Sequence, residues 1–263
     1  IIKTILLQGT YNLTMCGIFM LLNNPRHMSK DSAIVENSFM KGQKRGPEHS
    51  ILTEFRMSVP IGFHRLAING LNTAANPPLI VNGVHLICNG EIYNYKELYA
   101  SLDITPETDS DCEVIIHMYL KFGMEETLKM LDGVFAFALQ DTNIIEYPIF
   151  LARDPYGIRP LYEMNNPSYN SDNSNIFYGF ASEMKSLIEI MDYQYNQRTI
   201  KQFEPGTFTK FVYPQKVCAA WQKTITHKRY TMLPFINQMP QTDETISQTI
   251  RDTLISAVEK RVR

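Results

Sequence analysis

The sequence lacks the features that mark nucleic-acid-binding and membrane proteins. Its 25 Lys and Arg residues are offset by 27 Asp and Glu residues, which gives a net charge of −2. A chain with this balance has no polybasic surface of the kind that binds nucleic acid or anionic lipid. No apolar run approaches the roughly 18 residues that a membrane span needs. We therefore expect neither nucleic acid nor a membrane as a partner.

Cysteine is scarce, and its spacing favours neither a metal site nor a disulfide framework. The four cysteines are Cys16, Cys88, Cys112 and Cys218; none forms a Cys-x-x-Cys pair, and no histidine cluster has zinc-like spacing. Residues 1–7 are apolar but too short for a secretory signal, and they lack a small-residue cleavage site. We expect reduced thiols, no metal ion and a cytoplasmic location.

What the sequence does contain is a potential nucleophile in residues 15–19, Met-Cys-Gly-Ile-Phe. We expect residues 1–15 to be a leader or an artefact whose removal leaves Cys16 with a free α-amine. The thiolate is the nucleophilic form of cysteine, whose pKa is about 8.5, and an α-amine titrates near ~7.7–8.0. One residue then supplies both nucleophile and base. On this stretch alone, a cysteine that is only a small buried hydrophobe remains the simpler interpretation.

The apolar periodicity predicts strands and helices that do not alternate strictly. Helix 110–122 would start with Ser110 and Glu113 as a capping box and end at Gly123. Strands in pairs and threes, with helices bunched between them, favour a layered α+β fold with antiparallel sheets. The predicted strands are 16–22, 51–59, 61–68, 79–88, 133–141, 149–154, 176–182 and, as the last, 207–213, and the predicted helices are 30–44, 94–102, 110–122, 183–191 and 243–263.

A series of short motifs carries a resemblance to a known family. Their order and spacing resemble the class II glutamine amidotransferase domain of glutamine-hydrolysing asparagine synthetases, from residue 16 to about residue 213. Asn-Gly-Glu-Ile-Tyr-Asn and Ser-Asp-Cys-Glu resemble this family more than amidotransferases in general. The resemblance implies the N-terminal-nucleophile fold, a four-layer αββα sandwich of two antiparallel sheets between helices. The motifs are residues 15–19, 45–47, 64–68, 89–94, 110–113, 131–138, 152–162, 181–187 and 204–206.

The residue types in these motifs suit the chemistry of free glutamine. A selective site needs a cation for the α-carboxylate, an anion for the α-ammonium and donors for the oxyanion. Arg65 suits the carboxylate, Glu91 and Asp111 suit the ammonium, and Asn89 with the Gly90 amide suits the oxyanion, at roughly 3–4 kcal/mol per donor in a known protease. The predicted catalytic residues are Cys16, Asn89 and Gly90, and the predicted substrate-binding residues are Arg65, Leu66, Ala67, Ile68, Asn69, Asn89, Gly90, Glu91 and Asp111.

Each of these residues also has a simpler interpretation when taken alone. Arg65 could form a surface ion pair, Asp111 could complement a helix N-terminus, and Asn-Gly could be a turn. We interpret the block 153–162 as scaffold and His64 as a packed core histidine, because the resemblance supplies no catalytic histidine. Glu48 stands where the family usually has aspartate, on the loop that covers the glutamine.

The resemblance also implies a domain order and a function. We expect a glutaminase domain at 16–213, a linker at 214–242 and, at 243–263, the first helix of a truncated synthetase domain. The expected reaction is hydrolysis of L-glutamine through a Cys16 glutamyl thioester, without a cofactor. The ammonia would pass to a C-terminal synthetase domain, which would use ATP and Mg²⁺ to amidate aspartate; a homodimer is compatible with this.

Two other functions stay open. One is a different class II amidotransferase, such as an amidophosphoribosyltransferase-like enzyme, because Ile-Arg-Pro-Leu at residues 158–161 also resembles that pattern. The other is a non-catalytic glutamine-binding or interaction module in which Cys16 is blocked.

Overall fold

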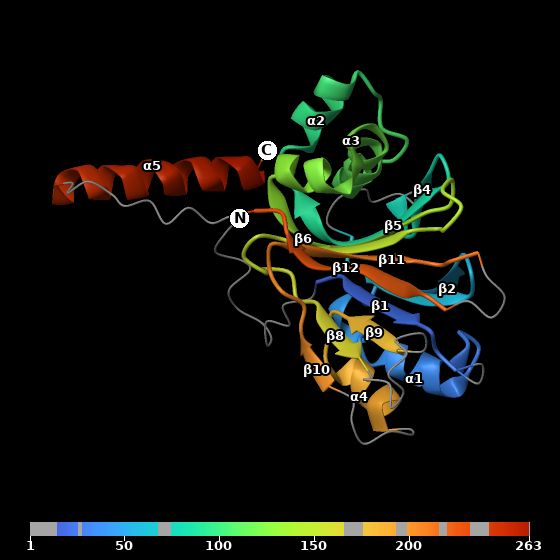
Figure 1. Cartoon of the computed structure of the whole chain (residues 1–263). Helices are drawn as coiled ribbons and strands as arrows, with labels where there is room; N and C mark the ends of the chain where they lie inside the picture. Colours follow the sequence, from blue (N-terminus) through green and yellow to red (C-terminus); the bar gives the residue numbers. More distant parts are fainter. Residues whose placement is uncertain are drawn as a thin grey trace.

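The computed structural model describes residues 15–25, 28–67, 75–165, 176–192, 199–215, 220–231 and 242–262. In these ranges the strands form two six-stranded sheets, stacked face to face with helices on both outer sides (Figure 1). All neighbouring strands in both sheets are antiparallel. The predicted α+β class and the four-layer αββα arrangement are therefore confirmed.

The first sheet contains the strand that follows Cys16. Its strand order is β10-β8-β9-β1-β3-β2. Helices α1 (Ala33–Met40) and α4 (Lys185–Asp192) cover its outer face (Figure 1), where Phe39 and Leu187 belong to one apolar cluster with β1 side chains. The strands are β1 (Gly17–Leu22), β2 (His49–Phe55), β3 (Val59–Arg65), β8 (Tyr162–Asn165), β9 (Tyr178–Ala181) and β10 (Thr199–Gln202).

The second sheet has the order β12-β11-β7-β6-β5-β4. Helices α2 (Tyr95–Leu102) and α3 (Val114–Met130) cover its outer face, and a 3₁₀ turn, η5 (Asp111–Glu113), leads into α3. The strands are β4 (Leu79–Val81), β5 (Val84–Ile92), β6 (Gly133–Asp141), β7 (Ile149–Arg153), β11 (Thr207–Val212) and β12 (Gln222–Arg229).

The central core lies between the two sheets and determines which side chains face inward. Alternate residues of a strand point to the same side of the sheet, and Ile18 of β1, Phe63 of β3 and Ile87 of β5 all pack in this core. Two residues along the chain from each of them are Cys16, Arg65 and Asn89, respectively. The strand period therefore directs three predicted site residues into the space between the sheets.

Three strands were not predicted, and residues 207–213 are not the last strand. β12 lies in the expected linker and pairs with β11. Its sequence, Gln-Lys-Thr-Ile-Thr-His-Lys-Arg, has one large apolar residue and suits an edge strand, which stays polar to avoid pairing with other chains. β8 and β10 have four residues each, too few for a clear alternation. The predicted strand 79–88 is instead the β4–β5 hairpin, turned at Asn82 and Gly83 with φ of 46° and 74°.

The predicted capping box before α3 is wrong. The Ser110 side chain makes no capping hydrogen bond. The Glu113 carboxylate accepts from the amides of Glu107 and Thr108, at 2.8 and 2.6 Å, and lies 3.0 Å from His117 Nε2. The helix also continues past Gly123, which has φ of 75° and kinks it, to Met130. Glu113 is thus used to fold the preceding loop and does not reach back to the cap.

Of two further helix predictions, one needed adjustment and the other is confirmed. The segment 30–44 forms α1 and a separate 3₁₀ turn, η3 (Gln43–Arg45). The last helix is confirmed as α5 (Asp243–Val262), which extends away from the sheets in Figure 1. Lys260 of α5 lies 2.6 Å from Asp132. None of the helices in the described ranges is both long and apolar enough to cross a membrane.

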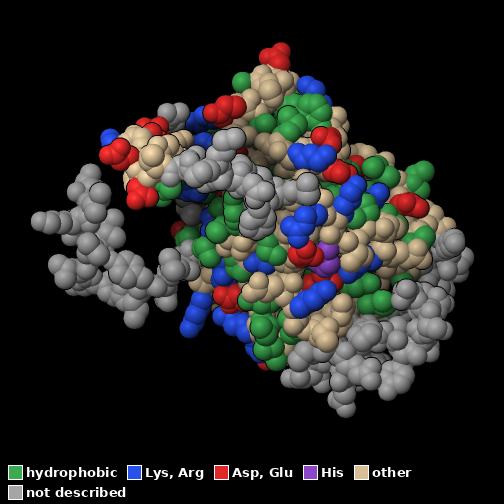
Figure 2. Space-filling view, turned by 60° about the vertical axis from the view of Figure 1, so that its left-hand side comes forward, with side chains coloured by type: hydrophobic (Ala, Val, Ile, Leu, Met, Phe, Trp, Pro, Cys, Tyr) green, Lys and Arg blue, Asp and Glu red, His purple; other side chains and the backbone are tan. Residues whose placement is uncertain are grey.

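The surface agrees with the near-neutral charge of the sequence. On the face drawn in Figure 2, Lys and Arg side chains are interspersed with Asp and Glu side chains among apolar ones. Interspersed charges produce no strong field of one sign over that face.

Candidate active site

A cavity lies where Cys16, directly before β1, meets residues of β3, β5 and η5. Of the predicted site residues, Ala67 is not in the cavity lining but follows the lining residue Leu66 in the sequence, and Ile68 and Asn69 fall outside the described part of the chain. The cavity is lined by the predicted residues Cys16, Arg65, Leu66, Asn89, Gly90, Glu91 and Asp111, together with Met15, Phe63, Ala75, Pro77, Leu79, Cys88, Ser110, Cys112 and Arg159.

Cys16 is held in this cavity through its sulfur and its carbonyl. The Leu66 amide donates to Sγ at 3.3 Å, and Sγ lies 3.4 Å from the Leu66 carbonyl oxygen. Burial raises the pKa of the Cys16 thiol, while the Leu66 backbone and the charges of Arg159 and Arg65 act in the opposite direction. A thiol with a raised pKa is a weak nucleophile at neutral pH. The sulfur therefore needs a nearby base to become reactive.

Arg45 supports Cys16 from behind, although sequence analysis did not count it as a site residue. Its Nε donates to the Cys16 carbonyl oxygen at 2.9 Å, and its Nη1 lies 3.5 Å from the Glu183 carboxylate. The next residue, Gly46, has no room for a side chain, because a Cβ would lie 2.4 Å from the His64 carbonyl carbon. The feature of the sequence that could have indicated this role of Arg45 is the Arg-Gly-Pro motif, in which Gly46 allows two backbone segments to approach closely.

Asn89 and Gly90 present hydrogen-bond donors on the other side of the cavity. Both lie inside β5, opposite Ala136 and Phe135, so the Asn-Gly turn interpretation is wrong. Asn89 Nδ2 is buried and has no acceptor within the described residues. The amide and carbonyl of Phe135, the partner of Gly90 on β6, both bond to Asp154 and not to Gly90. The Gly90 amide and carbonyl therefore point away from β6. On that side Cys112 Sγ lies 3.7 Å from the Gly90 carbonyl oxygen.

Two carboxylates lie together near these donors. Asp111 Oδ2 accepts from the Ile92 amide at 2.6 Å, so the Asp111 carboxylate is fixed by β5 as well as by its place at the start of η5. Burial and the charge of Asp111 raise the pKa of the Glu91 carboxyl. A cation bound between Glu91 and Asp111 would offset this repulsion. The pair is therefore suited to an ammonium group.

Arg65 provides a cation at the opposite wall. Its guanidinium is buried, with Nη1 2.5 Å from Asn76 Oδ1, so Arg65 is not a surface ion pair. A planar guanidinium in a buried site is well suited to bind a carboxylate. The cavity thus combines a thiol, amide donors, a cation and two carboxylates.

Arg159 is a cavity residue that sequence analysis missed. The block 153–162 was interpreted as scaffold, and Arg153 and Asp154 have that role: Arg153 Nε donates to the Arg159 carbonyl at 2.8 Å, and Asp154 Oδ2 accepts from the Arg159 amide at 3.0 Å. These buried contacts turn the loop so that the Arg159 side chain reaches the cavity. A cation within the otherwise apolar sequence Gly-Ile-Arg-Pro was the available signal.

His64 is confirmed as a packed core histidine. Its ring stacks on Phe39, with centroids 4.0 Å apart and planes 7° apart. Nδ1 lies 2.7 Å from Ser50 Oγ and Nε2 lies 2.9 Å from the Phe39 carbonyl oxygen. Burial lowers the pKa of His64, which favours the neutral ring. Both ring nitrogens are used for packing contacts, and His64 is not among the cavity-lining residues.

Comparison with known proteins identifies the family. A model of the glutamine amidotransferase domain matches residues 15–230. The chain belongs to this family. The match runs past residue 213, where the resemblance was expected to end, and includes β12.

Curated relatives of the chain include glutamine-hydrolysing asparagine synthetases. The chain is 36% identical to that of Gallus gallus and 34% identical to that of Homo sapiens. A probable asparagine synthetase of Acanthamoeba polyphaga mimivirus is 33% identical. Each match covers 198 residues, which are 74% of this chain and 33% of the relative. The chain therefore spans about a third of the length of the curated relatives it matches.

Solved structures support the fold independently of close sequence identity. The glutamine phosphoribosylpyrophosphate amidotransferase of B. subtilis superposes with a TM-score of 0.57 at 22% identity, over 83% of this chain and 50% of that chain. At this identity the likeness shows the shared fold alone. It agrees with the N-terminal-nucleophile sandwich that the motifs implied.

Proposed function

We propose that the chain is the glutamine-hydrolysing domain of an asparagine synthetase and that it converts L-glutamine to glutamate and ammonia. One observation carries this proposal: the thiol, the amide donors and the charged groups that glutamine needs all line one cavity. They come from Cys16, directly before β1, and from β3, β5 and η5, which are segments far apart in the sequence. Arg65 would bind the α-carboxylate, and Glu91 with Asp111 would bind the α-ammonium.

The first half of the reaction would form a thioester. Cys16 Sγ attacks the side-chain amide carbon of glutamine while the α-amine of Cys16 takes the thiol proton. The carbonyl oxygen becomes an oxyanion that accepts hydrogen bonds from Asn89 Nδ2 and the Gly90 amide. When the intermediate collapses, the carbon–nitrogen bond breaks and the proton passes from the α-amine to the leaving nitrogen, which departs as ammonia.

The second half would release glutamate. Water attacks the thioester carbonyl, and the α-amine of Cys16 accepts a proton from that water. The carbon–sulfur bond breaks, the proton returns to Sγ, and glutamate leaves. The sum is glutamine plus water giving glutamate plus ammonia, with the enzyme unchanged. No cofactor enters this sequence of steps.

This mechanism requires that Cys16 be the first residue. While Met15 is attached, the nitrogen of Cys16 is an amide and cannot act as a base. We propose that residues 1–15 are removed in the active form. The raised pKa of the buried Cys16 thiol makes that base necessary, since burial disfavours a spontaneous thiolate.

The whole protein would deliver the ammonia to a synthetase domain. That domain would follow residue 263 and use ATP and Mg²⁺ to amidate aspartate, in the cytoplasm and with a homodimer as one assembly to test. α5 would be its first helix, after a connection that starts beyond β12. Ile250, Leu254 and Val258 of α5 are 55–60% exposed, as expected for a helix whose packing partner lies in the rest of the protein.

The test is a comparison of two versions of the protein, one beginning at Cys16 and one retaining residues 1–15. Glutamate release from glutamine is measured for both. We expect activity only in the version that begins at Cys16, because only that version has the α-amine. In that version Cys16→Ala should lower kcat by at least about a thousandfold, as for removal of a catalytic nucleophile in a protease.

Two controls make the result decisive. Cys218→Ala removes a thiol that belongs to none of the sequence motifs and should leave the rate unchanged. Circular dichroism of each protein establishes that the fold is intact. If the trimmed protein is folded but releases no glutamate, or if Cys16→Ala keeps full activity, the proposed function is wrong.

A further inference from the structure

Arg159 occupies a position that the reaction described above does not use. Its Nη1 lies 2.6 Å from the sulfur of Met15, the residue bonded to the nitrogen of Cys16. Its Nε is buried and has no acceptor within the described residues. A guanidinium with an unused donor, facing the residue that must be removed, lies next to the place where the new α-amine would form.

The loop that carries Arg159 is built to hold it there. Arg153 Nη2 donates to the Gly157 carbonyl at 2.8 Å, and Asp154 Oδ1 accepts from the Ile158 amide at 2.9 Å. Both Arg153 and Asp154 are buried. Charged residues are seldom buried without such contacts, so the loop geometry is fixed independently of what Arg159 itself touches.

The other cations around Cys16 already have partners. Arg45, from η3, holds the Cys16 carbonyl and faces Glu183, which follows β9. Arg65, from β3, contacts Asn76 and faces the proposed substrate. Removing Met15 would take away the Nη1 partner of Arg159 and leave its charge beside the new amine.

The titratable groups on the opposite side of the cavity add little positive charge. β5 contributes Cys88 and Glu91, and η5 contributes Asp111 and Cys112. The charge of Arg159 lowers the pKa of the Cys16 thiol and that of the Glu91 carboxyl, so it acts on both sides of the cavity. A charge that acts on Cys16 Sγ and contacts the residue bonded to the Cys16 nitrogen would act on that nitrogen in the same way.

We propose that Arg159 is a positioning residue whose guanidinium, once freed from Met15, keeps the α-amine of Cys16 uncharged and able to accept the thiol proton. The inference rests on the proposed function of Cys16. An ordinary α-amine has a pKa near ~7.7–8.0, so at pH 7 most of it is in the ammonium form, which cannot accept a proton. A neighbouring cation destabilises the ammonium form and so increases the fraction of free base. Cys16 and its amine titrate as a coupled pair, and the cation shifts both apparent pKa values downward.

The experiment measures kcat/KM for glutamine from pH 5 to pH 10 with the protein that begins at Cys16. In Arg159→Met we expect the midpoint of the acid limb to move up by about one pH unit. At pH 7, kcat/KM should then fall by about fivefold, with a smaller difference above pH 9. Arg159→Lys, which restores a positive charge, should return the limb toward its original position.

A matched control removes the same charge elsewhere. Arg56 is exposed in the β2–β3 turn, roughly 20 Å along the hairpin from Arg65. Arg56→Met should leave the pH profile unchanged. Thermal unfolding of all variants shows whether any loss comes from misfolding, and refitting KM and kcat separately shows whether substrate binding is affected.

A second readout does not depend on glutaminase activity. The rate at which iodoacetamide alkylates Cys16, followed by mass spectrometry of its peptide, reports the same titration without glutamine. If the trimmed protein is inactive, the proposed function fails, but this alkylation profile still tests Arg159. An unchanged acid limb and an unchanged alkylation profile in Arg159→Met overturn the inference. A rise in KM with an unchanged limb also overturns it, because Arg159 would then bind substrate.

Discussion

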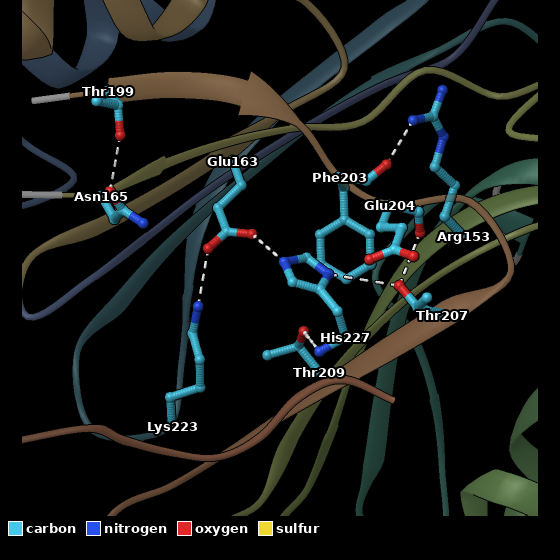
Figure 3. Close-up of polar contacts among 10 residues, drawn as sticks. All are labelled: Arg153, Glu163, Asn165, Thr199, Phe203, Glu204, Thr207, Thr209, Lys223 and His227. Carbon is cyan, nitrogen blue, oxygen red and sulfur yellow. Dashed lines mark hydrogen bonds and ion pairs between the residues drawn. The ribbon is translucent and has the colours of Figure 1, made fainter. Parts of the chain in front are cut away.

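Two groups of largely buried charged side chains lie between the two sheets. One surrounds the cavity at Cys16, and the other consists of Glu163, Lys223 and His227. We call the second group the Glu163 cluster; Figure 3 shows Glu163, on β8, between Lys223 and His227, both on β12. Glu163 Oε1 accepts from Lys223 Nζ at 2.8 Å, and Oε2 lies 2.9 Å from His227 Nε2. On its other side, His227 Nδ1 lies 3.4 Å from Thr207 Oγ1. The carboxylate is thus paired on both oxygens.

The two groups differ in how the protein treats their charges. Despite burial, the contacts with His227 and Lys223 lower the pKa of Glu163 to about 2, so its charged form is stabilised by the fold. In the cavity, burial and Asp111 raise the pKa of Glu91, and Asn89 Nδ2 has no acceptor in the described structure. Buried charge alone therefore does not mark a site. Donors and charges left without full compensation, beside a cavity, do.

The comparison predicts opposite consequences for mutations in the two groups. In the cavity, Asn89→Ala should reduce kcat for glutamine by about 10²–10³-fold, because one oxyanion donor is lost. KM should change little, since the donor acts on charge that develops only during the reaction. The melting temperature should stay the same or rise, because an unpaired buried amide is removed. Steady-state kinetics and calorimetry on the protein beginning at Cys16 provide both numbers.

A different outcome for Asn89 would contradict the catalytic role assigned to its amide. If Asn89→Ala lowered the melting temperature by many degrees and kept kcat, the amide would be part of the scaffold. Asn89→Asp is a useful second variant, because it keeps the size of the side chain but places a negative charge near the oxyanion. It should be at least as inactive as Asn89→Ala.

In the Glu163 cluster, Glu163→Gln should reduce stability and leave kcat within about twofold of the parent protein, because no reacting group touches it. The folded-state pKa of Glu163 is below its unfolded value of about 4.3. Its contribution is therefore fully present above that unfolded value and is lost as the pH falls toward 2. Linkage gives roughly 2–4 kcal/mol.

Urea unfolding at several pH values checks the Glu163 prediction. The difference between parent and Glu163→Gln should be largest near pH 7 and should shrink between pH 4 and pH 2. Glu204→Gln is the matched control, because Glu204 pairs with Arg229 at about half exposure on the same edge of the sheet. An exposed pair of this kind should change stability by about 0.5 kcal/mol or less. Equal effects at Glu163 and Glu204 would contradict the assigned role of the cluster.

The difference between the two groups also explains what the sequence could predict. Cys16 directly precedes β1, and Arg65 and Asn89 lie on β3 and β5. These segments are apolar enough to be recognised as strands from the sequence, and the common inward direction of the three residues then follows from the strand period. The motifs around them then supply the expected chemistry. The Glu163 cluster lies on β8 and β12, a four-residue strand and a polar edge strand. Neither has the periodicity that would have placed those residues opposite each other.

Local signals also failed where tertiary contacts compete for the same side chain. Ser110 and Glu113 have the spacing of a capping box, yet Glu113 bonds to the loop before η5 and to His117. Arg159 looked like scaffold because its neighbours Arg153 and Asp154 are scaffold. In both cases the sequence shows which groups can form hydrogen bonds, but only the folded arrangement shows which partner each group takes.

The smallest predicted effect concerns Glu48, at the rim of the cavity, and tests whether the rim contributes to glutamine binding. Glu48 Oε2 accepts from the Ala67 amide at 2.5 Å, one residue after Leu66, whose amide contacts Cys16 Sγ. Glu48→Asp shortens the side chain by one methylene and should weaken this exposed hydrogen bond, worth about 1 kcal/mol. KM should rise by about threefold to fivefold at nearly constant kcat and stability, while Glu48→Gln, which keeps length and acceptor, should behave like the parent. A lower KM in Glu48→Asp would instead show that aspartate, the residue we expect in the family, orders the loop better than glutamate does. Glu48 would then weaken the binding of glutamine.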